Sequence, residues 1–196
     1  MSPTAPSTSP VHPSAPERPE REPRGARFWG ALRLALGWIF LWAFLDKLLA
    51  LGFATGRDDK TGVVDRFGDA AWINGGSPTE GFLSLGLNTR WFFDDLYSDL
   101  AGQAWVDWIY MISMAVIGVA LILGVATRLA AVAGIVWMLL FYTAAALWPE
   151  NNPFMDDHLV YAILLAGIAS VGAGRYLGLG RQWERLPVVQ RHPVLR

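Results

Sequence analysis

Four apolar runs of membrane length follow residue 26 of the chain, and polar segments separate them. They cover residues 28–52, 105–125, 129–148 and 158–177. At a rise of 1.5 Å per residue, about 20 helical residues cross a hydrocarbon core of ~30 Å. The alternative of buried helices in a soluble protein does not fit the size of these runs. The pattern predicts an all-α integral membrane protein, folded as a four-helix bundle of four spans in the lipid bilayer.

The segments between the runs differ greatly in length. Only Thr127 and Arg128 separate the second run from the third, which predicts a tight antiparallel hairpin. Residues 53–104 are too many for a plain connection. Their apolar residues recur at helical spacing in two clusters. The clusters comprise Val63, Val64, Phe67 and Ala71, and then Phe92, Phe93, Leu96, Tyr97 and Leu100.

Each cluster is expected to form a short amphipathic helix, so that residues 53–104 make a lid on the outer side of the membrane. Between the two helices, Gly75, Gly76 and Pro78 predict a turn. Thr79 is a suitable N-cap for a helix that starts after this turn. Two roles are open for this lid: it encloses a substrate site, or it only packs against the bundle.

The two ends of the chain differ in composition from its centre. Residues 1–26 hold seven of the 12 prolines and few large apolar residues. Such a segment cannot bury enough surface to offset the entropy of ordering, which predicts a disordered tail. We expect a membrane domain over residues 27–186 and a short C-terminal tail over residues 187–196. The prolines of the first tail are Pro3, Pro6, Pro10, Pro13, Pro16, Pro19 and Pro23.

Basic residues gather on one predicted side of the membrane. Ten of the 16 lie in the tails, at the hairpin turn and after the fourth run. The positive-inside rule places these segments in the cytoplasm. The sequence thus predicts a multi-pass protein of the cell membrane with both termini cytoplasmic and an acidic outer side. The ten residues are Arg18, Arg21, Arg24, Arg27, Arg128, Arg175, Arg181, Arg185, Arg191 and Arg196.

Composition removes several classes of chemistry. The chain has no cysteine, which excludes disulfides, thiolate metal sites, iron–sulfur clusters and covalent haem. No glycine motif for a dinucleotide or flavin is present, and the runs offer no second histidine to join His158 on a metal ion or haem. With a net charge of −1 and no basic stripe, nucleic acid is not an expected partner.

Charged residues inside the runs are the candidates for chemistry, because a charge in lipid is costly. Arg33 and Lys47 lie near opposite ends of the first run, where a long side chain can also snorkel to the interface. Asp46 and Lys47 form a pair of opposite charges beside the lid. His158 follows two aspartates at the start of the fourth run. It is either a proton carrier or the polar start of a helix.

Three stretches carry a resemblance to a known family. They are "RLALGWIFLWAFLDKLL" (33–49), "WINGGSPTEGFL" (72–83) and "NNPFMDDHLVYAILLAGIASVGAGRYLGLGRQWE" (151–184). Over residues 28–186 the chain resembles the DoxX/DoxD family of four-span membrane proteins. The resemblance implies a membrane subunit of a thiosulfate:quinone oxidoreductase, with no firmly assigned catalytic residue. The recurrent polar positions of the family correspond to Arg33, Gly37, Asp46, Lys47, Asn152, Pro153, Asp157 and His158.

These observations lead to a hypothesis about quinone. A quinone would bind directly, in a cleft between helices that opens to lipid. His158 and Lys47 are expected to converge in one polar pocket beneath the lid. The candidate catalytic groups are His158, Lys47 and Asp46. The candidate ligands of a quinone or an anion are Lys47, His158, Tyr161 and Arg33.

The thiosulfate half of that reaction meets an objection. Thiosulfate is a dianion, and an acidic outer face repels it unless Lys47 or Arg90 reverses the local field. The competing hypothesis is a non-catalytic membrane anchor or assembly partner, whose lid docks a second oxidoreductase subunit or a secreted redox enzyme. Small residues at every fourth position favour close helix packing and would also suit a homo-oligomer. They are Ala126, Ala130 and Gly134, and then Ala166, Ser170 and Gly174.

Overall fold

A computed structural model of the protein describes residues 24–58, 60–85, 94–146, 149 and 152–195. Within these ranges the fold is all-α, with one isolated β-bridge between Arg57 and Val64. The longer α-helices are α1 (Ala26–Leu49), α4 (Ala104–Leu123), α5 (Thr127–Phe141) and α6 (Asp157–Val171). The shorter ones are α2 (Glu80–Leu85), α3 (Asp94–Leu100), α7 (Gly180–Trp183) and α8 (Pro187–Arg191). A π-helical turn, η2 (Tyr142–Ala146), continues α5, and 3₁₀ turns occur at η1 (Trp72–Asn74), η3 (Ala173–Arg175) and η4 (Pro193–Leu195).

Among the described residues, three helical stretches are long and apolar enough to cross a membrane. They are Ala26–Leu49, Ala104–Leu123 and Thr127–Ala144, which match the first three predicted runs. Large apolar side chains lie exposed on the outward sides of these helices, where water would solvate them poorly. They include Trp38, Ile39, Ile112, Val116, Val119, Val132, Val136 and Leu139. These three helices indicate a multi-pass helical membrane protein.

The fourth predicted run does not form a helix of that length. Helix α6 has 15 residues, which span roughly 22 Å at 1.5 Å per residue. It ends because Gly172 adopts the left-handed conformation, with φ 61° and ψ 45°, and its N–H bonds back to the carbonyls of Ala169 and Ile168. A glycine takes this geometry with little strain and so terminates helices. The prediction of one helix over residues 158–177 is wrong at its C-terminal end.

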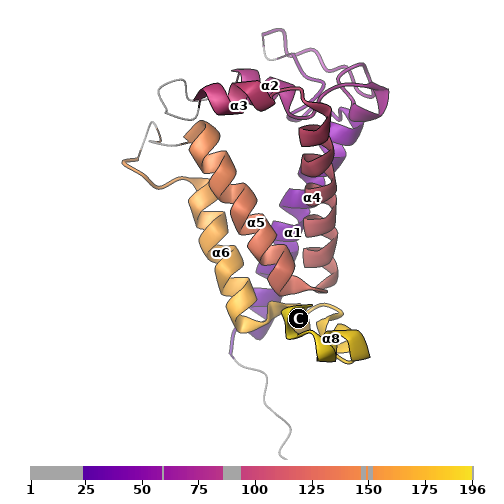
Figure 1. Cartoon of the computed structure of the whole chain (residues 1–196), viewed down its shortest axis with the longest axis vertical. Coiled ribbons are helices and arrows are strands. Elements are labelled where there is room, and N and C mark those ends of the chain that lie inside the picture. Colours follow the sequence, from indigo (N-terminus) through magenta and orange to yellow (C-terminus); the bar gives the residue numbers. More distant parts are fainter. Residues whose placement is uncertain (1–23, 59, 86–93, 147–148, 150–151, 196) are drawn as a thin grey trace, which may run out of the picture.

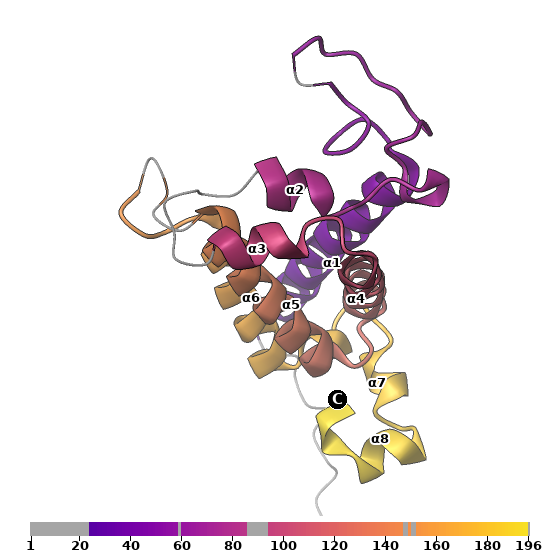
Figure 2. The same cartoon turned by 45° about the horizontal axis from the view of Figure 1, so that its top comes forward.

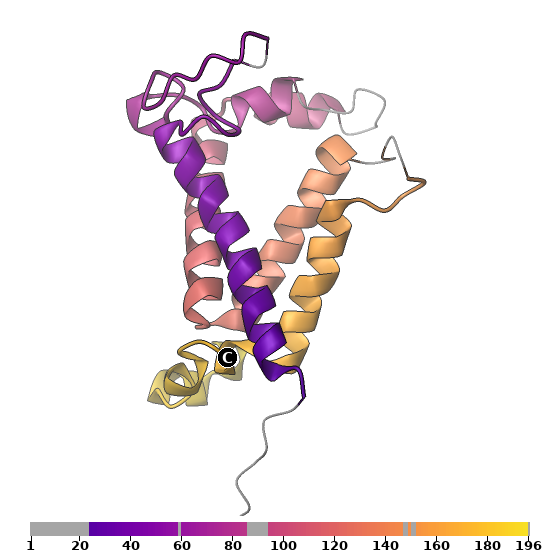
Figure 3. The ribbon, with the colours of Figure 1, turned by 180° about the vertical axis from the view of Figure 1, so that it is seen from behind.

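The long helices are arranged as two pairs. Helix α1 packs mainly against α4, and α5 against α6. The pairs diverge toward the end that carries α2 and α3 and come together at the end that carries the C-terminus (Figure 1; Figure 3 from behind). We call these the lid end and the terminal end. The core between the pairs takes side chains from all four helices: Leu36, Phe40, Met111, Met114, Leu121, Met138, Leu165 and Ile168.

Two glycines allow α1 and α4 to approach closely. A Cβ atom on Gly118 would lie 2.6 Å from the backbone nitrogen of Leu41, and one on Gly37 would lie 3.0 Å from that of Ile122. The two backbones are therefore nearly in contact at these levels. Close approach through small residues is a common mode of helix packing in membranes.

The predicted hairpin between the second and third runs is present, but its turn lies earlier in the chain. Gly124 and Ala126 adopt left-handed conformations and make the turn, with φ 74° and 45°. Thr127 and Arg128, predicted as the connection, are instead the first residues of α5.

The lid is only partly as predicted. Helices α2 and α3 lie across the lid end, above α4 and α5 (Figure 2). Helix α3 confirms the second expected amphipathic helix, whose first residues fall outside the described ranges. The helix expected over residues 63–71 is wrong. That segment is an irregular loop, in which Phe67 has a left-handed φ of 59° and Val64 pairs with Arg57.

The C-terminal segment is folded, in contrast to the expected tail over residues 187–196. Residues 187–195 form α8 and η4, and Val189 is fully buried. The indole Nε1 of Trp183 donates to the carbonyl of Leu195 at 2.6 Å, which holds the end of the chain against α7. The predicted disordered tail lies almost wholly outside the described residues.

Candidate functional site

A cleft of about 370 Å³ lies beneath the lid, between the diverging ends of α4 and α5. Helices α2 and α3 cover it, and the last turn of α1 reaches its wall through Lys47. Apolar and aromatic side chains make up most of its lining: Phe82, Leu83, Leu100, Trp105, Ile109, Trp137, Leu140 and Phe141. A cavity of this size and character suits a small apolar or amphipathic ligand.

Aromatic rings pack edge to face along one wall of the cleft. The ring centroids of Tyr110 and Trp137 are 5.5 Å apart at an interplanar angle of 87°. Those of Phe82 and Phe141 are 5.7 Å apart at 82°, which connects the lid helix α2 to α5. Trp137 and Phe141 also contact each other at 5.5 Å. Such contacts fix ring orientations, so the wall is a preformed surface against which a planar ligand can pack.

Lys47 is the only charged side chain in the lining of this cleft within the described chain. Its Nζ lies 5.8 Å from the centroid of the Tyr110 ring, within the range of a cation–π contact. It makes no hydrogen bond or ion pair with another described residue. Lys47 therefore places an ammonium donor, still available to a ligand, at the edge of an apolar cavity.

The lid is attached to the bundle by a buried carboxylate that was not among the predicted site residues. Oδ1 of Asp107, in the first turn of α4, accepts three hydrogen bonds. The donors are Thr79 Oγ1 at 2.6 Å, Ser77 Oγ at 3.0 Å and Thr79 N at 3.1 Å. The available signal was an acidic residue inside an otherwise apolar run. Thr79 thus binds Asp107 with its side chain, whereas Ser77 Oγ accepts from Glu80 N–H at 3.1 Å.

Asp46 is occupied by the backbone of the lid. It is buried, and its two oxygens accept from Phe53 N–H at 3.2 Å and Ala54 N–H at 2.9 Å. It does not line the cleft. The Asp46 carboxylate therefore fixes the loop that leaves α1, while its neighbour Lys47 faces the cleft.

His158 lies behind the aromatic wall and outside the cleft lining. Its ring packs against Phe141 with centroids 5.8 Å apart, and its Nδ1 is 2.6 Å from Oδ2 of Asp156. The other oxygen of Asp156 accepts from Leu159 N–H at 3.1 Å, so Asp156 is the N-cap of α6. Partial burial tends to raise the pKa of Asp156. Hydrogen bonds from His158 and Leu159 to the carboxylate lower this pKa by more than burial raises it, so the pKa of Asp156 lies below its ordinary value.

Ligand atoms of Asp156, Asp157 and His158 lie within 4.8 Å of one another. The 2.6 Å contact between Nδ1 and Oδ2 is a hydrogen bond, and two ligands of one cation normally stand farther apart. The cluster is accounted for as the capped start of α6.

The structure does not bring the predicted site residues together. Lys47 lies in the cleft, but two aromatic rings stand between it and His158. Lys47 contacts the Tyr110 ring, Tyr110 contacts Phe141, and Phe141 contacts His158. Tyr161 packs partly buried against the core. Among the described residues the lining of the cleft is mostly apolar and lacks His158, so they do not form the expected polar pocket shared by Lys47 and His158.

Arg33 lies at the terminal end of the bundle, far along α1 from Lys47, and is fully buried. Its guanidinium donates to the carbonyls of Leu121 and Ile122, which end α4, and to those of Tyr176 and Leu177. The alternative of snorkelling to the interface is therefore wrong. A cation at a helix C-terminus satisfies carbonyls that have no intrahelical partner and interacts favourably with the helix dipole. Arg33 joins α1, α4 and the segment after α6.

Comparisons with protein families, with curated proteins and with solved structures find no match to this chain.

Proposed function

We propose that the protein is a four-span protein of the cell membrane, with residues 158–177, which are most of α6 and the segment after it, as the fourth crossing segment. Helix α6 packs along α5, which supports a shared orientation. It exposes Val160, Ile163 and Val171 outward, as expected of a lipid-facing side. Short helices can cross a bilayer when the membrane thins locally or when flanking residues complete the span.

Within this fold we propose that the cleft beneath the lid binds a quinone, and that the protein is a membrane subunit of a quinone-linked oxidoreductase system. One observation carries the proposal: an apolar, aromatic-walled cavity of about 370 Å³ has a single ammonium group at its edge. A quinone has an apolar ring, two carbonyl acceptors and an isoprenoid tail. These three parts match the aromatic wall, Lys47 and a route to lipid.

The route to lipid is indicated by the lining residues that are also exposed. Trp105 and Ile109 on α4, and Val136 and Leu140 on α5, line the cleft and are exposed on the outer surface. An isoprenoid chain could leave between these residues along an apolar surface. A water-soluble substrate would gain nothing from such an exit.

The residues present fit a quinone as a bound group. When bound, a quinone supplies two-electron and two-proton carrier chemistry. Lys47 donates a hydrogen bond to a carbonyl oxygen, and the edge-to-face rings orient the quinone ring. Asp107 keeps the lid over the cleft, which limits the access of water. Thiosulfate fits less well, because a dianion in this cleft would meet one cation and otherwise apolar walls.

Quinone retention by the full-length protein tests the proposal. The protein is purified in mild detergent, and bound quinone is extracted and quantified by mass spectrometry against protein. Lys47→Met removes the ammonium group and keeps most of the side-chain volume. Loss of a charge-assisted hydrogen bond should weaken binding of an added short-chain quinone by about tenfold. Lys60→Met removes the other lysine of the chain, exposed on the lid loop, and should leave binding unchanged.

A second pair of variants distinguishes blocking of the cleft from a general loss of protein stability. Ile109→Trp adds bulk to the lining, whereas Ile112→Trp adds the same bulk to an exposed position nearby on α4 that does not line the cleft. Only Ile109→Trp should reduce quinone retention. Equal retention in all four variants, or no quinone in the wild-type protein, would contradict the proposal.

Membrane orientation has its own test. We propose that the lid end faces outward and the terminal end faces the cytoplasm, because most basic residues flank the terminal end. The chain lacks cysteine, so single cysteines can be placed at Val63 on the lid loop and at Val194 in η4, both exposed. An impermeant thiol reagent should label Val63→Cys in intact cells and Val194→Cys only after permeabilisation. The reverse result would invert the topology.

A second candidate function is favoured by the surface of the lid. Phe53, Val63, Phe67 and Ile73 are large apolar residues that lie exposed on the loop and turn over residues 53–74. Exposed apolar residues on a lid are typical of a docking surface, which fits a non-catalytic anchor for a soluble redox enzyme. A stoichiometric protein partner in the purified material, with no quinone, would favour this function. Charged substitutions at Phe53 and Ile73 should then release that partner.

A further inference from the structure

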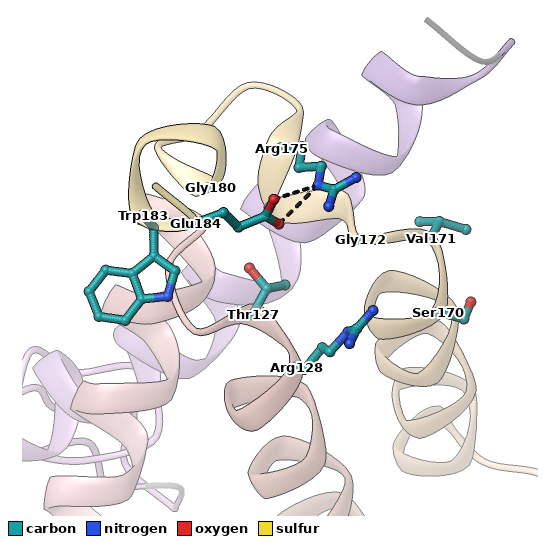
Figure 4. A pocket seen from close by; sticks show the side chains of 11 residues that line it. Thr127, Arg128, Ser170, Val171, Gly172, Arg175, Gly180, Trp183 and Glu184 are labelled. Carbon is teal, nitrogen blue, oxygen red and sulfur yellow. Dashed lines mark hydrogen bonds and ion pairs between the residues drawn. The ribbon is translucent and has the colours of Figure 1, made fainter. Parts of the chain in front are cut away.

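A second cleft lies at the terminal end of the bundle and measures about 130 Å³ (Figure 4). It is bordered by the start of α5, the end of α6 and the segment after α6. In contrast to the cleft beneath the lid, this one is lined by polar and charged side chains, among them Thr127, Arg128, Ser170, Arg175 and Glu184.

Thr127 supplies the first observation that points to a ligand. The residue is 4% exposed, and its Oγ1 is buried without a hydrogen-bond partner among the described residues. Figure 4 shows the hydroxyl pointing into the cleft, toward the side of Glu184 and Arg175. A buried hydroxyl without a partner is unfavourable, so such a group usually has one.

The N-terminus of α5 is the second observation. No side chain caps it, because the N-cap residue is Ala126, and its first turn carries no acidic residue. The first N–H groups of a helix lack intrahelical acceptors and sit at the positive end of the helix dipole. A 15-residue helix that begins in this way attracts an anion, and Thr127 and Arg128 are its first two residues.

The charges around the cleft are positive in sum. Arg128 is exposed and forms no hydrogen bond or ion pair within the described parts of the chain. Arg175 is paired with Glu184, whose two oxygens lie 2.9 and 3.0 Å from its Nε, so these two charges offset each other. Arg33 lies just below the floor of the cleft: a Cβ on Gly124 would be 3.3 Å from its Cζ. No described acid pairs with Arg33.

We propose that this cleft binds a phosphate group. The oxyanion would accept hydrogen bonds from Thr127 Oγ1 and from the Arg128 guanidinium, in front of the α5 N-terminus. A water molecule needs about 10–15 Å³ of such space, so 130 Å³ holds a tetrahedral oxyanion with room to spare. Glu184 does not prevent this, since Arg175 already neutralises it.

Two sources present the same chemistry: an anionic phospholipid headgroup and free inorganic phosphate. The cleft lies beside the N-terminus of α5 and the C-terminus of α6, at the terminal end of the bundle, which favours the headgroup. A neighbouring hollow lined by Arg27, Arg175 and Arg181 favours it as well, because basic clusters attract anionic lipids. The headgroup source rests on the proposed placement of this end at the membrane surface. The inorganic phosphate source does not depend on that placement, nor on quinone binding.

The test uses the full chain in two settings. In nanodiscs that contain phosphatidylcholine with or without phosphatidylglycerol, native mass spectrometry measures which lipid stays bound. In detergent without anionic lipid, the shift of the thermal midpoint is measured with inorganic phosphate against chloride at matched ionic strength. Preferential retention of phosphatidylglycerol identifies the headgroup. A phosphate-dependent shift without lipid preference identifies the free anion.

Arg128→Gln should weaken the observed binding about tenfold through loss of one charge-assisted hydrogen bond. Arg191→Gln is the matched control, because it removes an equal charge at the same end, outside the cleft lining. Arg128 is exposed, so its replacement does not threaten folding. If the two variants weaken binding equally, the interaction depends only on net charge, and the proposed site is overturned. Absence of both lipid preference and phosphate shift in the wild-type protein would overturn it as well.

Thr127 provides a readout that a purely structural role would not give. Thr127→Val replaces a hydroxyl that has no partner among the described residues with a methyl group of the same size, so the unliganded protein should unfold at the same or a higher temperature. Phosphate or headgroup binding should nevertheless fall, and Thr127→Ser should retain it. Wild-type binding in Thr127→Val, or a loss of stability together with binding, would count against the site.

Discussion

Thr79 and Asp107, 28 positions apart, are joined by two hydrogen bonds to one carboxylate oxygen, from the Thr79 hydroxyl at 2.6 Å and its N–H at 3.1 Å. Both residues are buried. This connection ties the lid to the first turn of α4 and sets the height of the lid above the apolar cleft.

Asp107→Ala should loosen the lid. The substitution leaves the donors of Thr79 and Ser77 without their acceptor, at a cost of about 1–3 kcal/mol. We expect a lower thermal midpoint in detergent and faster proteolysis within residues 53–104. Asp107→Asn keeps a carbonyl acceptor at Oδ1 and should lose much less. Equal protease resistance in all three proteins would show that Asp107 does not hold the lid.

Arg33→Met should destabilise the whole bundle, because it removes the side-chain donor of four backbone carbonyls, of which Leu121 keeps the N–H of Gly124, and removes the link between α1, α4 and residues 176–177. We expect a loss of at least about 3 kcal/mol, or failure to accumulate in the membrane. Arg33→Lys should not restore stability, since an ammonium group cannot span carbonyls on both sides as a guanidinium fork does. The control is Arg27→Met, at an exposed position near the start of α1. The measurement is the thermal midpoint of the three variants in detergent. An Arg33→Met protein as stable as Arg27→Met would contradict this role of Arg33.

Gly118→Ala should separate α1 from α4. The added Cβ would lie 2.6 Å from the Leu41 nitrogen, closer than real Cβ contacts, and backbone cannot move aside as a flexible side chain can. We expect a loss of about 1–3 kcal/mol, typical of overpacking. Gly81→Ala in α2 is the comparison, since a Cβ there meets nothing within 4 Å. It should be neutral or slightly stabilising, as alanine favours a helix over glycine. A Gly118→Ala protein as stable as Gly81→Ala would contradict the close packing.

The Asp156 cap should make stability depend on pH in the acid range. The pKa of Asp156 is lowered in the folded protein, so its contribution is complete above its ordinary value of about 4 and is lost as the pH falls through the folded value. Asp156→Asn keeps an N-cap side chain but removes this titration. The difference in thermal midpoint between wild type and Asp156→Asn should therefore shrink as the pH is lowered below about 4. A constant difference from neutral to acid pH would contradict the assignment.

Several features can be predicted from the sequence without a tertiary structure. Apolar composition over a membrane length is a local property, so the sequence predicts three long helices nearly to their ends. Charge segregation along the chain is also a property of the sequence alone, and it predicts that the terminal end is basic. The start of the fourth apolar run also places His158 at the beginning of a helix, where the structure pairs it with the N-cap, Asp156.

Tertiary structure decided the roles of the charged residues, because each role depends on which backbone groups come within hydrogen-bond reach. Arg33 and Lys47 look equivalent along one apolar run, yet Arg33 meets four carbonyls from two distant segments and Lys47 meets an aromatic ring. From the sequence alone Asp107 resembles an acid at the membrane interface, and only the tertiary structure shows that it accepts a hydrogen bond from Thr79. The left-handed turn at Gly172 ended a helix that apolar composition alone would have continued, since hydrophobicity favours burial in lipid but does not determine backbone conformation.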